Sequence, residues 1–240
     1  MRTHGVLVVA LIVALSVAPA SQGKYKETAV TNGGAVAGSV KFSGAVPPRA
    51  KLTVDKDLEV CGKGGDKLSE ALVVSPAKEI KNVVVTLEGI AAGKKFSTRT
   101  ATLDQRNCAY VPHVLAVPVG GQLGLLNGDG VMHNVHAYSL KNTPFNESIP
   151  ATKKSAKTLT FSEVVKMGCD VHKWMGAWVI VVENPYYAIT AETGGFKIDE
   201  IPAGKYVLRV WHESLGKVDK EVTIAAGQTV AVDFQMSKAR

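Results

Sequence analysis

The chain has 240 residues, of which 46% are hydrophobic, and a formal net charge of +7 at neutral pH. This composition can bury a substantial core in one large or two small domains. The Lys and Arg residues are scattered and do not cluster with aromatic residues, which argues against a nucleic-acid-binding protein. The positive charge instead favours acidic protein partners or an anionic surface.

Residues 1–20 have the pattern of a secretory signal peptide. Arg2 precedes an apolar run from Val6 to Val17, and Ala18-Pro-Ala20 provides a small-residue cleavage site. The run is too short to span a bilayer, and no later segment is apolar for long enough, so no transmembrane segment is expected in the mature chain. We predict export across the inner membrane into the periplasm, with an uncleaved anchor as the alternative. The signal contains Arg2 and no acidic residue, so its removal changes the charge from +7 to +6.

The rest of the chain is composed of short apolar or alternating runs separated by Gly- and Pro-containing turn signals. These runs predict strands at residues 35–42, 82–87, 114–119, 123–127, 133–139, 157–161, 178–182, 196–199, 205–211, 220–224 and 229–234. Helical periodicity is weak throughout, and only short turns are expected at residues 70–72 and 145–148. Short strands at this spacing predict an all-β fold made of sandwiches.

The three cysteines are Cys61, Cys108 and Cys169. Exported proteins fold in an oxidising compartment, where free thiols tend to pair. If Cys169 binds a metal, Cys61 and Cys108 can form a disulfide, which would stabilise the fold by about 4 kcal/mol in the chain-entropy treatment. The alternatives are a Cys108–Cys169 bridge, or a second metal site in which Cys61 and Cys108 join His113.

The stretch Cys169-Asp-Val-His172-Lys-Trp-Met175 contains a thiolate, an imidazole and a thioether within seven residues. A second imidazole lies upstream, in His133-Asn-Val-His136. One Cys, two His and a weakly bound Met are the ligands of a blue-copper electron-transfer site. His133 and His136 are three residues apart, so in a strand they face opposite sides and only one of them can reach the metal. A zinc site is the less natural alternative because Met is not a usual zinc ligand.

These two motifs resemble the copper loops of cupredoxins of the amicyanin and plastocyanin type, over roughly Val114 to Glu183. The resemblance implies one copper ion, Cu(I) or Cu(II), held by four ligands: His133, Cys169, His172 and Met175. It also implies that Asn134 ties the two loops together and that the edge of His172 emerges at the surface as the exit for electrons. Lys173 stands where this family usually has proline. Trp174 then either forms an apolar rim with Met132 or packs inward.

Residues 190–210 resemble a second family, the carboxypeptidase regulatory or transthyretin-like domain. The resemblance rests on Phe196-Lys-Ile, Pro202-Ala-Gly and Tyr206-Val-Leu-Arg-Val. The opening strands of that family look like residues 38–42 and 82–87, which precede the copper motifs. We therefore expect a Greek-key cupredoxin sandwich inserted into, or joined to, a transthyretin-like sandwich; two consecutive sandwiches are the alternative. The predicted parts are a signal peptide at 1–20, an N-terminal part of the transthyretin-like sandwich at 33–95, the cupredoxin domain at 100–183 and a C-terminal part at 184–238.

Together these features predict an exported type 1 (blue) mononuclear copper protein that carries single electrons. The expected partner is a redox protein such as a cytochrome or a dehydrogenase. No catalysis is expected, because the ligand set provides no open coordination position for a substrate. A copper carrier or sensor without a redox role, and a carbohydrate- or matrix-binding module, are the alternatives.

Overall fold

The computed structural model describes residues 24–238, so the predicted signal peptide lies outside the described residues. Within this range the secondary structure consists of nineteen strands and one short helix, which confirms the predicted all-β fold class. The elements that precede the first large sandwich are β1 (Lys26–Glu27), β2 (Gly34–Phe42), α1 (Leu58–Cys61), β3 (Val84–Glu88) and β4 (Ala92–Gly93).

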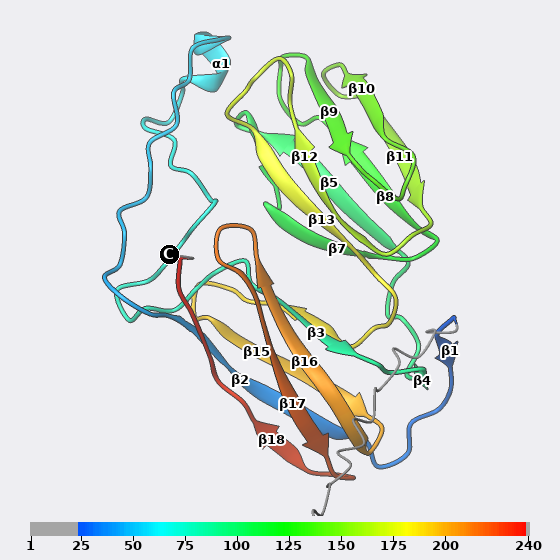
Figure 1. The fold of residues 1–240 in the computed structure, drawn as a ribbon. Coiled ribbons are helices and arrows are strands. Elements are labelled where there is room, and N and C mark those ends of the chain that lie inside the picture. The colour runs from blue at the N-terminus through cyan, green and yellow to red at the C-terminus, as the bar shows by residue number, and fades with distance from the viewer. Residues whose placement is uncertain (1–23, 239–240) are drawn as a thin grey trace, which may run out of the picture.

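The first sandwich, in the upper half of Figure 1, follows in the chain. Its strands are β5 (Thr100–Arg106), β6 (Ala109–Val111), β7 (Val114–Pro118), β8 (Gly121–Leu126), β9 (His133–Tyr138), β10 (Phe145–Ile149), β11 (Lys154–Leu159), β12 (Glu163–Gly168) and β13 (Gly176–Val182). One sheet has the order β10-β9-β12-β13-β7, and the other has the order β11-β8-β5-β6. Alternate residues of β9 and β13, such as Val135 and Val179, are fully buried between the sheets, as expected for half-buried strands.

The second sandwich is built from segments on both sides of the first. Its later strands are β14 (Tyr187–Ile189), β15 (Gly195–Ile201), β16 (Gly204–His212), β17 (Gly216–Ile224), β18 (Thr229–Ala231) and β19 (Phe234–Met236). The early strand β3 pairs with β14 and β16, and β2 pairs with β15, β18 and β19. Strands β2 and β3, which precede the first sandwich in the chain, are inner strands of sheets whose other members follow it. In the sequence, the first sandwich is therefore inserted between the two parts of the second. At Gly38 of β2 a Cβ atom would lie 1.9 Å from the carbonyl oxygen of Val232, so this close approach requires glycine.

The two sandwiches share a small apolar core of their own. Val114, Ile180 and Val182 of the first sandwich pack with Val84 of the second. Trp178 and Trp211 meet edge to face with their ring centroids 5.4 Å apart, beside this cluster. Direct burial of aliphatic and aromatic side chains therefore joins the two sandwiches.

Seven strands were not predicted, namely β1, β4, β5, β6, β10, β12 and β14. The segment at 145–148, expected as a turn, belongs to strand β10. The predicted strand at 157–161 corresponds to β11, which lies in the sheet opposite to the ligand loop. Strand β12 instead leads directly into Cys169; its central Lys166 and terminal Gly168 weaken the apolar signal by which a strand is recognised.

A long connection between β2 and β3 carries the short helix α1. Figure 1 shows α1 beside the upper end of the first sandwich, far from the strands that this connection joins. The disulfide between Cys61 and Cys108 attaches it there. Within residues 24–238, no helix is long and apolar enough to cross a membrane.

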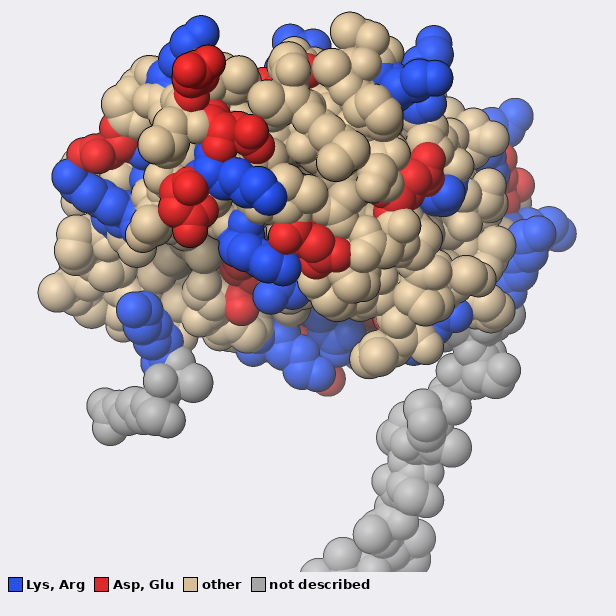
Figure 2. All heavy atoms as spheres, turned by 90° about the horizontal axis from the view of Figure 1, so that it is seen from above, with Lys and Arg blue, Asp and Glu red and all other residues tan. Residues whose placement is uncertain are grey.

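On the face shown in Figure 2, positive and negative side chains do not gather into separate patches. Lys and Arg are interspersed with Asp and Glu around a broad uncharged area. This distribution agrees with the scattered pattern of Lys and Arg in the sequence.

Candidate metal centre

Three of the four predicted ligands converge at one end of the first sandwich. His133 begins β9, while Cys169 and His172 lie on the loop between β12 and β13. The Nδ1 atoms of His133 and His172 are 2.8 Å apart, and Cys169 Sγ is 3.8 Å from His172 Nδ1. All three side chains are buried, and their possible ligand atoms lie within 4.8 Å of one another.

These separations suit a shared metal ion. Bonds from nitrogen or sulfur to a metal such as zinc measure about 2.0–2.3 Å, so two ligands of one ion lie less than roughly 4.5 Å apart. Both measured contacts meet this limit. One thiolate with two imidazoles is a soft donor set that copper accepts in both oxidation states.

The outer nitrogens of the two rings indicate where the inner lone pairs point. His133 Nε2 lies 2.9 Å from Asp129 Oδ2, and His172 Nε2 lies 2.7 Å from Asp57 Oδ2. Each carboxylate can accept a hydrogen bond from an Nε2–H group, and a neutral ring with its proton on Nε2 directs the lone pair of its Nδ1 atom inward. Burial lowers the pKa of His133, which favours the neutral ring. Two lone pairs 2.8 Å apart repel each other, and a cation bound by both removes that repulsion.

Met175, the predicted axial ligand, is buried in the same core cluster as Cys169. Its backbone N–H donates to the carbonyl oxygen of His172 at 2.9 Å. The loop from Cys169 to Met175 therefore closes on itself, and Met175 lies at its end. The axial role of its sulfur remains a prediction.

Asn134 connects the two loops. Its Oδ1 atom lies 3.2 Å from Cys169 Sγ and accepts the backbone N–H of Asp170 at 2.7 Å. Its backbone carbonyl accepts the Tyr110 hydroxyl at 2.5 Å, and the same hydroxyl donates to the carbonyl of Gly168. Asn134 thus contacts both Cys169 and the residue that follows it, and its role in tying the two loops around a metal stays a prediction.

His136 lies outside this cluster. Its Nδ1 atom is 3.1 Å from Asp170 Oδ2, and its ring stacks on Tyr138 with the centroids 4.1 Å apart. The alternation of the strand sends the two histidines to opposite faces, and His133 is the one that faces Cys169.

The predicted surface exit through His172 is wrong. The whole residue is buried, and Asp57 and Trp174 lie against its ring. Trp174 is half-buried against the core of the first sandwich and donates from Nε1 to the carbonyl of Cys108 at 3.0 Å, whereas Met132 is exposed. The expectation failed because Asp57 comes from 115 residues upstream, on a connection that the cupredoxin resemblance does not include.

The structure distinguishes between the alternative pairings of the three cysteines. Cys61 and Cys108 form a disulfide, and Cys169 is a free thiol. The His113 ring does not join the sulfur atoms; it contacts the Gly176 carbonyl and the Glu213 carboxylate.

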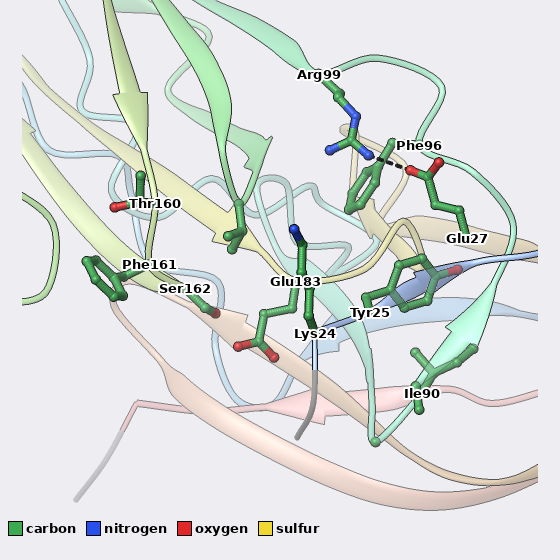
Figure 3. A pocket seen from close by; sticks show the side chains of 13 residues that line it. Lys24, Tyr25, Glu27, Ile90, Phe96, Arg99, Thr160, Phe161, Ser162 and Glu183 are labelled. Carbon is green, nitrogen blue, oxygen red and sulfur yellow. Dashed lines mark hydrogen bonds and ion pairs between the residues drawn. The ribbon is translucent and has the colours of Figure 1, made fainter. Parts of the chain in front are cut away.

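Three cavities adjoin the first sandwich, and one of them, of about 350 Å³, is lined by Ile180 of the first sandwich and Trp211 of the second. Another, of about 380 Å³, is bordered by Trp174, Met175, His113 and Glu213, on the outer side of the ligand loop. The largest, of about 550 Å³, is shown in Figure 3; Phe161, Phe96 and the ion pair between Arg99 and Glu27 line it, and none of the predicted metal ligands does. Of the four predicted ligands, Met175 borders the cavity of about 380 Å³, whereas His133, Cys169 and His172 are buried and line none of these three cavities.

In a comparison with known protein families, the C-terminal part of the chain matches one family model. Residues 175–237 match the carboxypeptidase regulatory-like domain. The match begins at Met175, directly before β13 of the first sandwich, and continues through the late strands of the second. A search of characterised proteins found no significant relative.

Among solved structures, the chain is similar to several cupredoxin proteins. A purple cupredoxin from Nitrosopumilus maritimus is 22% identical, with a TM-score of 0.31, over 34% of this chain and 99% of its own. The reduced state of an amicyanin variant is 21% identical, with a TM-score of 0.32, over 35% of this chain and 82% of its own. A Cu-containing nitrite reductase from Thermus scotoductus is 20% identical, with a TM-score of 0.34, over 38% of this chain and 24% of its own. At these identities and TM-scores the likeness to the solved structures carries no argument about function. The family match and these neighbours name the same two families as the resemblances found in the sequence.

Proposed function

We propose that this chain is an exported type 1 (blue) mononuclear copper protein that carries single electrons between redox partners. The observation that supports this proposal most is the pair of Nδ1 atoms 2.8 Å apart beside the Cys169 thiol, with both Nε2 atoms held by carboxylates. This arrangement presents one thiolate and two neutral imidazoles to a single point. A bound copper ion there would accept and release one electron.

The surrounding residues would keep the ligands in place during that change. Cys169 and His172 are three residues apart on one short loop, and the backbone N–H of His172 lies 3.3 Å from Cys169 Sγ. Asn134 holds the loop against β9. Ligands fixed by packing and hydrogen bonds need little movement between the two oxidation states, and this makes electron transfer fast. We propose no catalytic activity, and a cytochrome or dehydrogenase as the class of redox partner.

The test is titration of the purified, metal-free protein with Cu(II), followed by visible absorption. An intense visible band saturating at one copper per chain is expected, and the Cys169→Ser protein should lack it while remaining folded. A protein that stays colourless after titration, or a Cys169→Ser protein with an undiminished band, would contradict the proposal.

A second candidate is a copper carrier or sensor without a redox partner. It is favoured by the covered edge of His172, because a buried ring gives a partner no direct approach to the metal. Slow electron self-exchange together with rapid copper loss to a chelator would support this candidate. Fast self-exchange with slow copper loss supports the electron carrier.

A further inference from the structure

Asp57 reaches the candidate metal centre from outside the first sandwich. Its Oδ2 atom lies 2.7 Å from Nε2 of the fully buried His172, and it is separated from that residue by 115 positions in the sequence. The backbone of Asp57 has φ 49° and ψ 45°, a left-handed conformation that few residues other than glycine adopt, although Asp tolerates it better than most. The chain therefore turns sharply at the residue that contacts His172.

The Cys61–Cys108 disulfide holds this turn against the metal centre. Helix α1 begins directly after Asp57 and ends at Cys61, which is bonded to Cys108. We call residues 57–61, attached through this disulfide, the cap. Cys61 is the only fully buried residue of the four-residue helix α1, and Val60 packs against the core of the first sandwich while partly buried.

The same disulfide also lies next to the partner of the other histidine. The backbone N–H of Cys108 donates to Asp129 Oδ2 at 2.7 Å, and that oxygen lies 2.9 Å from His133 Nε2. Trp174, whose ring meets His172 at a centroid distance of 5.0 Å, donates to the carbonyl of Cys108. The disulfide thus joins the segment that carries Asp57, the partner of His172, to a cysteine whose backbone N–H holds Asp129, the partner of His133.

We propose that Asp57 is a positioning residue of the metal centre, which holds His172 as the Nε2–H tautomer and lowers the reduction potential of the bound copper, and that the Cys61–Cys108 disulfide keeps Asp57 in place. The inference rests on the proposed function. Carboxylate partners of this kind orient ligating imidazoles and raise their basicity. A negative charge near the ion also stabilises the divalent state more than the monovalent state, because the attraction grows with the charge of the ion.

Two substitutions separate charge from hydrogen bonding. Asp57→Asn keeps an acceptor oxygen and removes the charge, whereas Asp57→Ala removes both. We expect the ratio of Cu(II) to Cu(I) affinity to fall in both variants and the potential to rise, by 59 mV for each tenfold change in that ratio in a one-electron couple. The matched control is Asp55→Asn, which removes an equal charge from an exposed residue two positions earlier on the same segment.

The role of the disulfide is tested by combining its removal with the substitution of Asp57. The Cys61→Ser/Cys108→Ser protein should show a raised potential like that of Asp57→Asn, and adding Asp57→Asn to it should change the potential little further. Such non-additivity is expected if the two changes act through the same contact. A full additional shift in the triple variant would show that the disulfide does not act through Asp57.

The measurements are the reduction potential of the copper form and the affinity for Co(II), a divalent probe that needs no redox chemistry. If the wild-type protein takes up no copper, the proposed function fails, and the Co(II) affinities alone decide the role of Asp57. A tenfold or larger loss of Co(II) affinity in Asp57→Asn, with no loss in Asp55→Asn, supports the proposal. An unchanged potential and affinity in Asp57→Asn, or an equal shift in Asp55→Asn, overturns it.

Discussion

The His113 ring of the first sandwich contacts the Glu213 carboxylate of the second through its Nε2 atom, while its Nδ1 atom lies 3.0 Å from the carbonyl oxygen of Gly176. Both side chains are largely buried, with 10% and 14% of their surfaces exposed. Burial alone would raise the pKa of Glu213, but the hydrogen bond and charge of His113 hold it below its ordinary value. This contact connects the second sandwich to the residue that follows Met175.

Breaking this contact is expected to destabilise the protein. Glu213→Ala should lower the free energy of unfolding by about 2–4 kcal/mol, because it leaves a buried imidazole without its partner. The double variant His113→Ala/Glu213→Ala should be more stable than the sum of the single effects predicts, by roughly 0.5–3 kcal/mol. Urea unfolding of the four proteins measures this coupling. Strictly additive effects would mean that the contact contributes nothing to joining the sandwiches.

Asn134 should matter for both stability and metal binding. Asn134→Ala removes the acceptor shared by Cys169 Sγ and the Asp170 N–H, so the loop loses its attachment to β9. We expect copper affinity to fall by about 10–100-fold, as for other partners of ligating residues. Competition with a Cu(I) chelator measures this change.

The control for that experiment is Asn146→Ala. Asn146 contacts Asn134 and Asp170 from the outer side and does not contact Cys169. Its copper affinity should stay within about threefold of wild type. If both variants lose affinity equally, the general integrity of the loop matters and the specific role of Asn134 is disproved.

The ligand cluster was predictable because its signals are local. Cys169 and His172 are three residues apart, the strand period allows only one of His133 and His136 to reach the metal, and the cupredoxin resemblance favours His133. The Asp129 contact also had a signal, since this acid stands four residues before His133. No sequence signal pointed to Asp57. Its role depends on the path of a connection without strand or helix patterns, and a disulfide between cysteines 47 positions apart attaches that connection near the site.

The missed strands have a similar cause. Strand β12 carries Glu163 and Lys166, and its conformation is set by pairing with β9 and β13 on either side, not by its own composition. In contrast, β13 has a continuous β-branched run that predicts a strand without any tertiary context. Single-sequence patterns therefore located the strands with strong apolar runs, and pairing partners determined the rest.

His212 gives the protein a pH-dependent stability. Burial lowers the pKa of His212 to about 4 from 6.5; Glu213 opposes this shift and His113 adds to it. The Nδ1 atom accepts the Ser214 N–H, whereas Nε2 has no hydrogen-bond partner within the described part of the chain. Between pH 6.5 and 4 the unfolded chain binds a proton at this group that the folded chain does not, so stability falls as the pH falls through that interval.

The size of the effect is at most about 1.4 kcal/mol per pH unit, which corresponds to one proton. His212→Asn retains an acceptor for Ser214 and should show a shallower decline of unfolding free energy between pH 6.5 and 4. Urea unfolding at pH 7, 6, 5 and 4 measures both slopes. Parallel curves for the two proteins would assign the decline to other groups.

Met175 should tune the potential without being required for copper binding. An amide oxygen is a harder donor than a thioether and favours Cu(II) over Cu(I), so Met175→Gln is expected to keep the copper and lower the reduction potential. Met175→Leu is the matched control, since it fills the buried site without offering any donor atom, and its potential should rise. Voltammetry of the three proteins measures these shifts. If Met175→Gln and Met175→Leu both retain the wild-type potential, the sulfur is not an axial ligand and Met175 serves the core alone.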